Sequence, residues 1–295
     1  MTAGDDRCVA CEGAAGPRGA VLADGHGFAV CPNCGTWNIV PRPNEAAQTA
    51  LHDSSAYDAH PYLAHRRANL EALDRRCAAI FARIGEHVDL GSLRGQRVLD
   101  VGCDDGQFVS SAARQFGICP VGVDVAQLAI QQARSNGVEA YHSPLESAHE
   151  ALTDFPVITA IDVIEHVPDP VAFVGALFGR LRPGGVAYIE TPNVASAVYR
   201  IGRAMCAAGH GRPAGTCRRL FPPEHIQYFS RAGLHRLAER CGLEIARQES
   251  RPLPAREIAV GPLTRSALSG LQLFDRISGE KILRWAIFRR PRLIG

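Results

Sequence analysis

The sequence predicts an α/β protein with a doubly wound, mostly parallel sheet, preceded by a small cysteine-rich module. Two observations lead to this fold class. From residue 97 to residue 191, short apolar runs alternate with stretches of helical periodicity, the pattern of repeated β–α units with helices on both faces of a sheet. Ahead of this region, four cysteines stand in two C-x-x-C pairs within the first 34 residues. We therefore expect a small N-terminal module and a large α/β domain.

The composition excludes several other classes. The 295 residues are 46% hydrophobic and 21% charged, with a net charge of +2, so the chain is too apolar and too nearly neutral to be disordered. No run of about 18 apolar residues occurs, and the N-terminus lacks the basic-then-apolar pattern of a secretory signal. We therefore expect a cytoplasmic protein whose ten cysteines are kept reduced.

The N-terminal module, residues 1–45, carries the cysteine pairs. Cys8 and Cys11 form one pair, Cys31 and Cys34 form the other, and 19 residues lie between them. Two such pairs are typical of a tetrahedral zinc site, because each makes a tight knuckle that presents two thiolates. Two redox dithiols are the alternative. Four thiolates leave no position for a catalytic water, so we predict a structural Zn²⁺ that also supplies folding energy to a segment with too small a core.

Residues 46–95 are expected to hold a linker and one helix. From Ala64 to Ile84, apolar residues recur at helical spacing on one face, so this helix is expected to lie against the next domain. Tyr57 and Tyr62 precede it, and we expect them either to pack on the surface or to reach over a pocket mouth.

The α/β domain is predicted to span residues 96–250. Its strands are expected at residues 97–102, 120–124, 138–142, 156–162 and 185–191. Its helices are expected at residues 106–116, 126–135, 170–181 and 231–241. Ligands of such sheets bind beyond the carboxyl ends of the strands, so the loops that follow the strands are where a site is expected.

The first of these loops, DVGCDDGQF at residues 100–108, has the features of a nucleoside site. Gly102 lets the chain turn sharply out of the strand, and Gly106 opens a helix whose N-terminus offers free N–H groups. The loop lacks the G-x-G-x-x-G of a dinucleotide site, and its two further acids would oppose a pyrophosphate. Asp124 ends the second strand, where a carboxylate can accept both hydroxyls of a ribose. The loop therefore favours a nucleoside that carries positive charge.

Four motifs, in order, carry a family resemblance. RVLDVGCDDGQF, PVGVDVAQLAIQQAR, VITAIDVIEHVPDPVAFV and LRPGGVAYIETPN resemble the class I S-adenosylmethionine-dependent methyltransferases of the small-molecule, UbiG-like type, over about residues 96–250. The resemblance implies a Rossmann-like fold with seven strands. One position departs from the family pattern, because Asp104 stands where the family's G-x-G-x-G has its middle glycine.

The resemblance also implies where S-adenosylmethionine binds. Residues of the first loop would surround its methionine portion, Asp124 would hold its ribose, the loops after the second and third strands would flank the adenine, and the fourth strand would end beneath the methyl group. The residues at these positions are Asp100, Gly102, Cys103, Gly106, Asp124, Val125, Leu145, Glu146, Asp162 and Val163.

The catalytic group is predicted at the end of the fourth strand. Such an enzyme must align a nucleophile with the methyl group and remove its proton if it has one. Glu165 and His166 stand there in DVIEHVPDP, and His225 stands in FPPEHIQYFS. A histidine with an ordinary pKa of about 6.5 suits deprotonation of a hydroxyl near neutrality. The alternatives are a capping role for His166 and a packing role for His225.

A divalent cation is an open alternative to direct base action. The resemblance includes quinone-pathway O-methyltransferases in which acids and a histidine hold such an ion. Asp162, Glu165 and His166 match that arrangement in type and spacing, so Mg²⁺ near these three residues is the second hypothesis.

Two further segments have expected roles. Residues 194–222 are interpreted as a lid over the acceptor, and their arginines favour either an anionic acceptor or a solvated surface; these are Arg200, Arg203, Arg212, Arg218 and Arg219.

The tail, residues 251–295, has nine basic and three acidic residues. It is predicted to form basic amphipathic helices broken near Gly279, with an apolar face that packs on the domain, forms a homodimer, or contacts an anionic membrane surface or RNA. The residues of that face are Leu271, Phe274, Ile282, Trp285 and Phe288.

The predicted function is transfer of a methyl group from S-adenosylmethionine to a small-molecule acceptor. The leading hypothesis for the acceptor atom is a hydroxyl oxygen of a sugar, a quinone or phenol, or a natural-product intermediate. Three alternatives are kept: a zinc-ribbon methyltransferase of ribosomal RNA bases, a relative of sugar C-methyltransferases, and a non-enzymatic scaffold. The near-neutral net charge is no strong signal for nucleic acid, since phosphate binding calls for a basic field.

Overall fold

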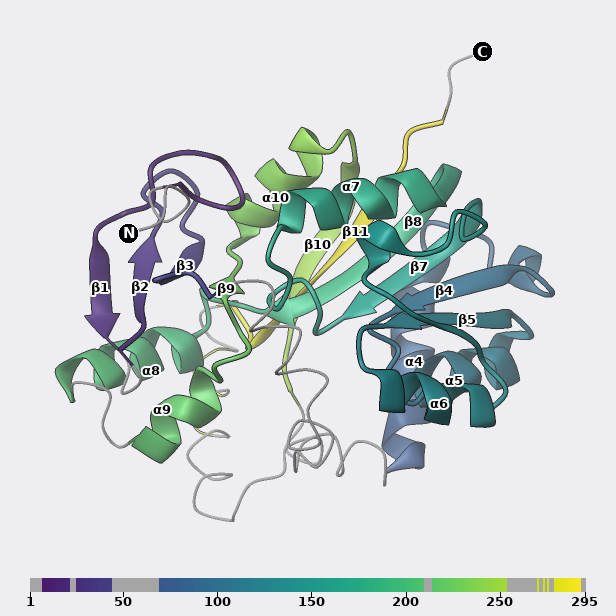
Figure 1. The fold of residues 1–295 in the computed structure, drawn as a ribbon, viewed down its shortest axis with the longest axis horizontal. Coiled ribbons are helices and arrows are strands. Elements are labelled where there is room, and N and C mark those ends of the chain that lie inside the picture. Colours follow the sequence, from purple (N-terminus) through teal and green to yellow (C-terminus); the bar gives the residue numbers. More distant parts are fainter. Residues whose placement is uncertain are drawn as a thin grey trace.

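The computed structural model describes residues 7–21, 25–43, 69–209, 214–253 and 279–292, together with residues 270, 273 and 275. The described chain forms two sheets, a large one flanked by helices and a small one beside it (Figure 1). Tyr57 and Tyr62 lie outside the described residues, as does the predicted start of the first helix.

The large sheet has seven strands in the order β10-β11-β8-β7-β4-β5-β6. Strands β4 to β8 pair in parallel, whereas β11 is antiparallel to both of its neighbours. This is the predicted doubly wound, mostly parallel sheet, and its order reverses at β4. The strands are β4 (Arg97–Val101), β5 (Cys119–Asp124), β6 (Glu139–His142), β7 (Phe155–Ile161), β8 (Leu181–Pro192), β10 (Glu244–Arg251) and β11 (Leu283–Arg289).

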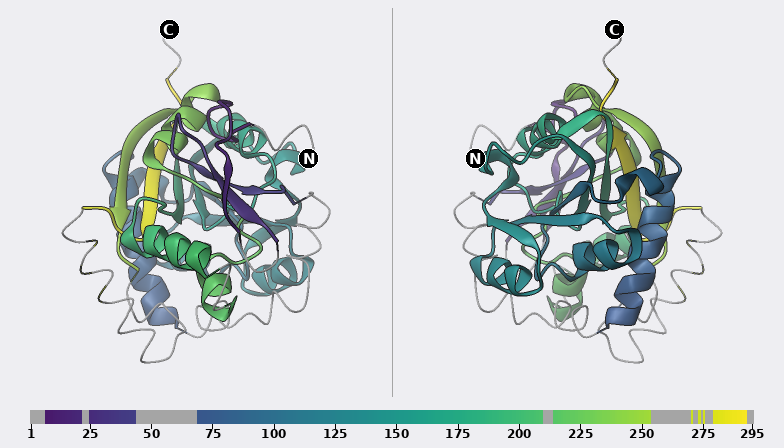
Figure 2. Two further views of the ribbon diagram at one scale, coloured as in Figure 1. Left: turned by 90° about the vertical axis from the view of Figure 1, so that its left-hand side faces the viewer. Right: turned by 90° about the vertical axis from the view of Figure 1, so that its right-hand side faces the viewer.

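Helices cover both faces of this sheet (Figure 2). On β4, Val98 packs in the core beneath α4 (Leu70–Gly85), α5 (Gln107–Phe116) and α6 (Gln127–Ser135). The neighbouring Leu99 belongs to the core on the opposite face, with α7 (Pro170–Arg180) and α10 (Arg231–Arg240). Burial on both faces explains why the strands appear in the sequence as continuous apolar runs. Two short 3₁₀ turns, Gly91–Leu93 and Leu145–Ser147, lie in the connections.

The small sheet joins the N-terminal module to the α/β domain. Its antiparallel strands are ordered β1 (Arg18–Val21), β2 (Gly27–Val30), β3 (Trp37–Val40) and β9 (Gln227–Tyr228). The last strand comes from the connection between β8 and α10, so residues about 190 positions apart pair directly: Trp37 lies opposite Tyr228. We name β1–β3 and their cysteine knuckles the ribbon.

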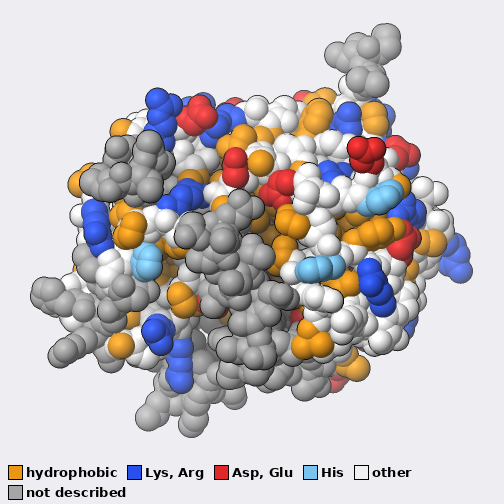
Figure 3. Space-filling model, viewed as in Figure 1, with side chains coloured by type: hydrophobic (Ala, Val, Ile, Leu, Met, Phe, Trp, Pro, Cys, Tyr) orange, Lys and Arg blue, Asp and Glu red, His pale blue; other side chains and the backbone are white. Residues whose placement is uncertain are grey.

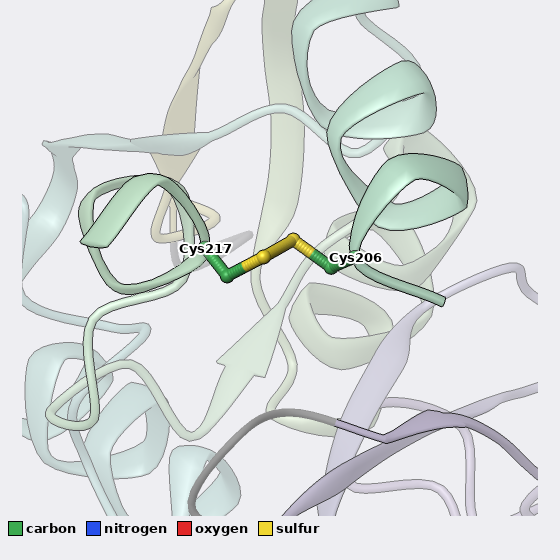
Figure 4. The surroundings of a disulfide bond; sticks show 2 residues. All are labelled: Cys206 and Cys217. Carbon is green, nitrogen blue, oxygen red and sulfur yellow. A yellow bond between two sulfur atoms is a disulfide. The ribbon is translucent and has the colours of Figure 1, made fainter. Parts of the chain in front are cut away.

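Within residues 194–222, the predicted lid, the described residues form helices α8 (Ala197–Ala208) and α9 (Ala214–Leu220). A disulfide bond between Cys206 and Cys217 links the two helices (Figure 4). The expectation that all ten cysteines are reduced is therefore wrong for this pair. Tyr199 of α8 packs against Phe221, which precedes β9, and against Tyr228 of β9, in a core that also contains Phe28 and Trp37 of the small sheet.

The predicted helical tail is wrong for residues 283–289. This segment is β11, which fills the gap between β8 and β10, and Trp285 and Phe288 lie in the cores of opposite faces. The predicted end of the α/β domain at residue 250 is therefore also wrong. Ile282, Trp285 and Phe288 stand three residues apart, a spacing that fits a helix as well as a buried strand. Leu271 and Phe274 lie outside the described residues.

The surface adds two observations. On the face shown in Figure 3, Lys and Arg side chains are dispersed among acidic and apolar ones. Among the helices in the described part of the chain, none combines the length and the apolar character needed to span a bilayer.

Candidate active site

The loop between β4 and α5 requires its two predicted glycines. Gly102 has φ +68°, and a Cβ atom there would lie 2.5 Å from Cγ2 of Val163. Gly106 has φ +75°, and a Cβ atom there would lie 2.7 Å from Cγ2 of Val138. A left-handed backbone and the lack of space both favour glycine at these positions. The loop can therefore turn out of the sheet within a few residues.

Acidic side chains surround this loop. Asp124, at the end of β5, accepts the backbone N–H of Asp104 at 2.9 Å through Oδ2 and that of Ala126 at 2.9 Å through Oδ1. The carboxylate of Asp100 is almost fully buried and accepts the hydroxyl of Thr159 at 2.6 Å. Asp124 is thus fixed in orientation by the loop it helps to form.

Asp104, which stands in place of the family's middle glycine, adopts a left-handed backbone with φ +51°. Such a backbone costs an L-residue about 1–2 kcal/mol, although aspartate tolerates it better than most residues. The substitution thus preserves the backbone that a glycine would give. Strain of this kind is often kept at functional sites.

We expect Asp104→Gly to stabilise the protein by about 1 kcal/mol and to raise Tm by about 2–4 °C, since it removes the penalty of the left-handed backbone at Asp104. Thermal denaturation followed by circular dichroism measures this. Asp154→Gly is the control, because Asp154 also has a left-handed backbone, with φ +64°, but is exposed and lies just before β7, at the opposite end of the sheet from the loop. A lower Tm for Asp104→Gly would contradict the expectation.

A pocket opens above the loop. Its walls include three of the predicted cofactor residues, Asp100, Gly102 and Cys103, and several that were not predicted: Leu73, Arg76, Asp105, Gln107, Phe108 and Ile161. The thiol of Cys103 is buried and would contact any Cβ atom placed at Gly122, and burial raises its pKa far above the ordinary value.

The other predicted cofactor residues are not among those that line this pocket. Val163 packs over Gly102, and the carbonyl oxygen of Val125 lies 2.9 Å from Nε2 of His142. Leu145 is buried in the core, whereas Glu146, beside it, is exposed. The structure therefore brings the loops after β4, β5 and β6 to one end of the sheet, as predicted.

Arg76 of α4 is a site residue that the sequence prediction missed. Its Nη2 donates to Glu190 at 2.7 Å and to Asp162 at 3.2 Å, and the residue also lines the pocket. Burial alone would raise the pKa of Glu190, but the guanidinium groups of Arg251 and Arg76 outweigh it and hold that pKa well below its usual range. One signal was present in the sequence: Arg76 stands three residues after Leu73 and four before Ile80, on the apolar face of the helix.

The loop after β7 carries the predicted catalytic residues. Asp162 has φ +58°, a left-handed backbone at the point where the chain leaves the strand. Glu165 is fully buried; its Oε2 accepts the hydroxyl of Thr191 at 2.9 Å, and its Oε1 has no hydrogen-bond partner among the described residues. Burial, with the nearby charge of Asp162, raises the pKa of Glu165 well above its ordinary value.

His166 and His225 lie against each other. Their ring centroids are 4.6 Å apart, with the rings nearly perpendicular. Nδ1 of His166 lies 2.9 Å from the carbonyl oxygen of Glu224. In the neutral tautomer that donates this hydrogen bond, Nε2 carries the lone pair, which is the form required of a base. Glu165, His166 and His225 also offer ligand atoms that all lie within 4.8 Å of one another.

The arginines predicted to attract an anionic acceptor do not converge. Arg203 lies over the ring of Trp37, with its guanidinium carbon 4.7 Å from the ring centroid. Arg200, Arg218 and Arg219 are exposed, and Arg212 lies outside the described residues.

The four cysteines of the ribbon form one cluster with the geometry of a zinc site. Their Sγ atoms all lie within 4.8 Å of one another; Cys8 and Cys34 are 3.5 Å apart, as are Cys11 and Cys31. Thiolates about 2.3 Å from one tetrahedral Zn²⁺ stand about 3.8 Å apart, so the cluster fits this ion. The knuckles are not separate from the α/β domain, because Cys8, Cys31 and Cys34 belong to the core that also contains α7 and α10.

The doubly wound sheet, with a glycine turn after β4 and an aspartate at the end of β5, defines a class of proteins whose ligand site lies at the carboxyl ends of the strands. Residues 63–248, more than half of the chain, match the family model described as a methyltransferase domain. The chain therefore belongs to the S-adenosylmethionine-dependent class I methyltransferases, as its motifs predicted.

Named relatives narrow the comparison. The chain is 30% identical over 203 residues to a ubiquinone biosynthesis O-methyltransferase of Idiomarina loihiensis, a match that covers 65% of this chain and 74% of that protein. It is 38% identical over 110 residues to the protein of the same name from Bordetella avium, covering 35% and 45% of the two chains. The chain spans about half the length of several of these relatives.

Solved structures share the fold at low sequence identity. Magnesium protoporphyrin IX methyltransferase from Synechocystis PCC 6803 with bound SAH is 14% identical, with a TM-score of 0.56, and the match covers 84% of this chain and all of that one. Phosphoethanolamine N-methyltransferase 2 from Haemonchus contortus, in complex with S-adenosyl-L-methionine, is 17% identical with a TM-score of 0.54, covering 83% and 60%. Such likenesses show the fold alone.

Proposed function

We propose that the protein transfers the methyl group of S-adenosylmethionine to a hydroxyl oxygen of a small phenol or catechol. The observation that carries this proposal is the pair of imidazoles, His166 and His225, beside buried Glu165 at the carboxyl end of β7. The names of the relatives support an oxygen acceptor of the quinone or phenol class.

The cofactor is proposed to bind along the loops at the carboxyl ends of β4, β5, β6 and β7. Asp124 would accept the ribose hydroxyls, and Val125, Leu145 and Glu146 would flank the adenine. Asp100, Gly102, Cys103 and Gly106 would surround the methionine portion. Arg76 would meet its carboxylate, because its guanidinium lines the pocket. Asp162 and Val163 would close the site beneath the methyl group.

The chain's own residues then have defined tasks. The bound sulfonium supplies a methyl group that is already activated for transfer, so the protein must orient the acceptor and take up its proton. His166, with Nδ1 held by the carbonyl oxygen of Glu224, is proposed to accept this proton at Nε2. The ring of His225 packs against His166 and limits its rotation. Glu165 ties the loop to β8 through Thr191.

Transfer of a tritiated methyl group tests this function. S-adenosylmethionine labelled in the methyl group is incubated with the protein and one of three acceptors: 3,4-dihydroxybenzoate, a small-molecule extract or total RNA. We expect label in the dihydroxybenzoate or the extract. Label in RNA alone would replace the proposal with the RNA base methyltransferase. If calorimetry detects no binding of the cofactor, the scaffold alternative is favoured.

A divalent cation is the second candidate for activating the acceptor. The observation in its favour is Oε1 of Glu165, which is buried without a hydrogen-bond partner among the described residues, close to His166 and His225. Mg²⁺ held near Asp162, Glu165 and His166 would lower the pKa of a bound hydroxyl. In protein reloaded with Zn²⁺ after dialysis against EDTA, activity that returns only when Mg²⁺ is also added would favour this candidate over direct base action.

We also propose that Cys8, Cys11, Cys31 and Cys34 bind a structural Zn²⁺. The support is the fit of four thiols within one cluster, three of which are buried. No open ligand position remains, so the ion is given no part in the chemistry.

A further inference from the structure

The loop that carries Glu165 and His166 is held through its backbone by a single glutamine side chain. Gln227 of β9 is fully buried, and its Nε2 donates to the carbonyl oxygens of Ile164 at 2.8 Å and Val167 at 2.7 Å. These two carbonyls flank the catalytic pair on either side. One amide group therefore fixes both ends of the segment from Ile164 to Val167.

The backbone of the same strand holds the middle of the loop. The N–H groups of Ile226 and Gln227 both point to the carbonyl oxygen of Glu165, at 3.0 and 3.3 Å. Together with the side-chain bonds, they hold three carbonyls of four consecutive residues. The backbone of the loop is therefore held at three points by β9 and the residue before it.

The ribbon in turn holds Gln227. Arg42, which follows β3, donates to Oε1 of Gln227 at 3.0 Å and to the carbonyl oxygen of Pro168. Asn38 of β3 lies opposite Gln227 in the sheet, and its side-chain oxygen accepts the N–H of Val9 at 3.3 Å. Val9 lies between Cys8 and Cys11. The hydrogen bonds of Gln227 are thus connected through one strand pair to a cysteine knuckle.

The side-chain amide of Gln227 uses both of its N–H donors and its oxygen. The two N–H groups donate to the loop, and the oxygen accepts a hydrogen bond from Arg42, which follows the ribbon. A residue buried only to fill space would not need this pattern, and a leucine would fill much the same volume. The arrangement requires an amide with both donors and an acceptor.

We infer that Gln227 is a positioning residue through which the ribbon sets the orientation of His166 for methyl transfer. The inference rests on the proposed function, in which His166 is the base. It makes the ribbon a wall of the catalytic site rather than a separate binding module. Catalysis should be sensitive to this link, because a misplacement of about 1 Å can cost roughly 100-fold in rate.

The test compares Gln227→Leu with Gln248→Leu in the full-length, zinc-loaded protein. Gln248 is the matched control, since it is also buried but its Nε2 donates only at 3.3 Å to the carbonyl oxygen of Arg231, on the β10 side of the domain. Three quantities are measured: kcat and KM for 3,4-dihydroxybenzoate, the Kd for SAH by calorimetry, and the ring nitrogen resonances of His166 by NMR.

We expect Gln227→Leu to lower kcat by about 10- to 100-fold, to shift the His166 resonances, and to leave the SAH Kd and the zinc content unchanged. Gln248→Leu should alter neither kcat nor the His166 resonances. Arg42→Met, at a partly exposed position, should shift the same resonances less; it decides the question if Gln227→Leu does not fold. Unchanged His166 resonances and unchanged kcat in both variants would overturn the inference.

Failure of the proposed function gives a different result. If the wild-type protein does not methylate dihydroxybenzoate, the NMR measurement still decides: shifted His166 resonances in Gln227→Leu support the positioning role, and unchanged resonances overturn it.

Discussion

Replacing His166 with alanine is expected to lower kcat at least about 100-fold, the usual scale for loss of a general base, while the SAH Kd stays the same. The reason is geometric. Nδ1 of His166 is engaged with the carbonyl oxygen of Glu224, which directs Nε2 to act as the base, and the imidazole that packs against it, that of His225, comes from the β8–α10 connection. Tritiated-methyl transfer to 3,4-dihydroxybenzoate and calorimetry with SAH provide the two measurements.

His235→Ala is the control for this variant. His235 is exposed on α10, and its Nδ1 lies 3.2 Å from Oε1 of Glu239 on the same helix. It should keep wild-type kcat. Full activity in His166→Ala would sink the assignment of the base. A parallel loss in His225→Ala would indicate that the two rings act as one unit.

Removal of zinc is expected to have the largest effect on stability. Structural zinc contributes about 10–16 kcal/mol of apparent binding free energy in small zinc modules, whereas whole domains are stable by only about 5–15 kcal/mol. A chelator should therefore unfold the ribbon. Because Ile39 of β3 donates its N–H to Ile226 beside β9, amide hydrogen exchange should accelerate at both strands and not only at the cysteines.

Cys34→Ser should reproduce the effect of the chelator, since it removes one buried ligand. Cys119→Ser is the matched control, because Cys119 is an exposed thiol at the start of β5, outside the cluster. Metal content by mass spectrometry and Tm accompany the exchange measurement. A protein that contains no zinc as purified, and whose Tm does not respond to the chelator, would contradict the zinc assignment.

Much of the α/β domain could be predicted from the sequence, for physical reasons. Strands buried on both faces give unbroken apolar runs, and the glycine turn at Gly102 and Gly106 has a steric cause that fixes the residue type. That Glu165 and His166 lie in one site could be predicted because they are neighbours in the sequence. That His225 lies against His166 was not visible in the sequence, because it depends on how the β8–α10 connection returns to the sheet.

The parts that could not be predicted depend on contacts between distant segments. The three-residue spacing of Ile282, Trp285 and Phe288 favours a helix, and only pairing with β8 and β10 makes this segment the strand β11. Arg76 is a charged residue on an apolar helix face. Its role is explained only by its ion pair with the buried Glu190, 114 residues away in the sequence. The bond between Cys206 and Cys217 likewise depends on how α8 and α9 pack.

The two-residue strand β9 makes the ribbon and the methyltransferase domain inseparable. The small sheet takes three strands from the start of the chain and its fourth from the middle of the methyltransferase domain, so neither part can be excised as a cassette. A protein shortened to begin after residue 43 would leave β9 as an unpaired edge and uncover Tyr228, which is fully buried. Grafting the ribbon onto another methyltransferase would require transplanting residues 226–230 with it.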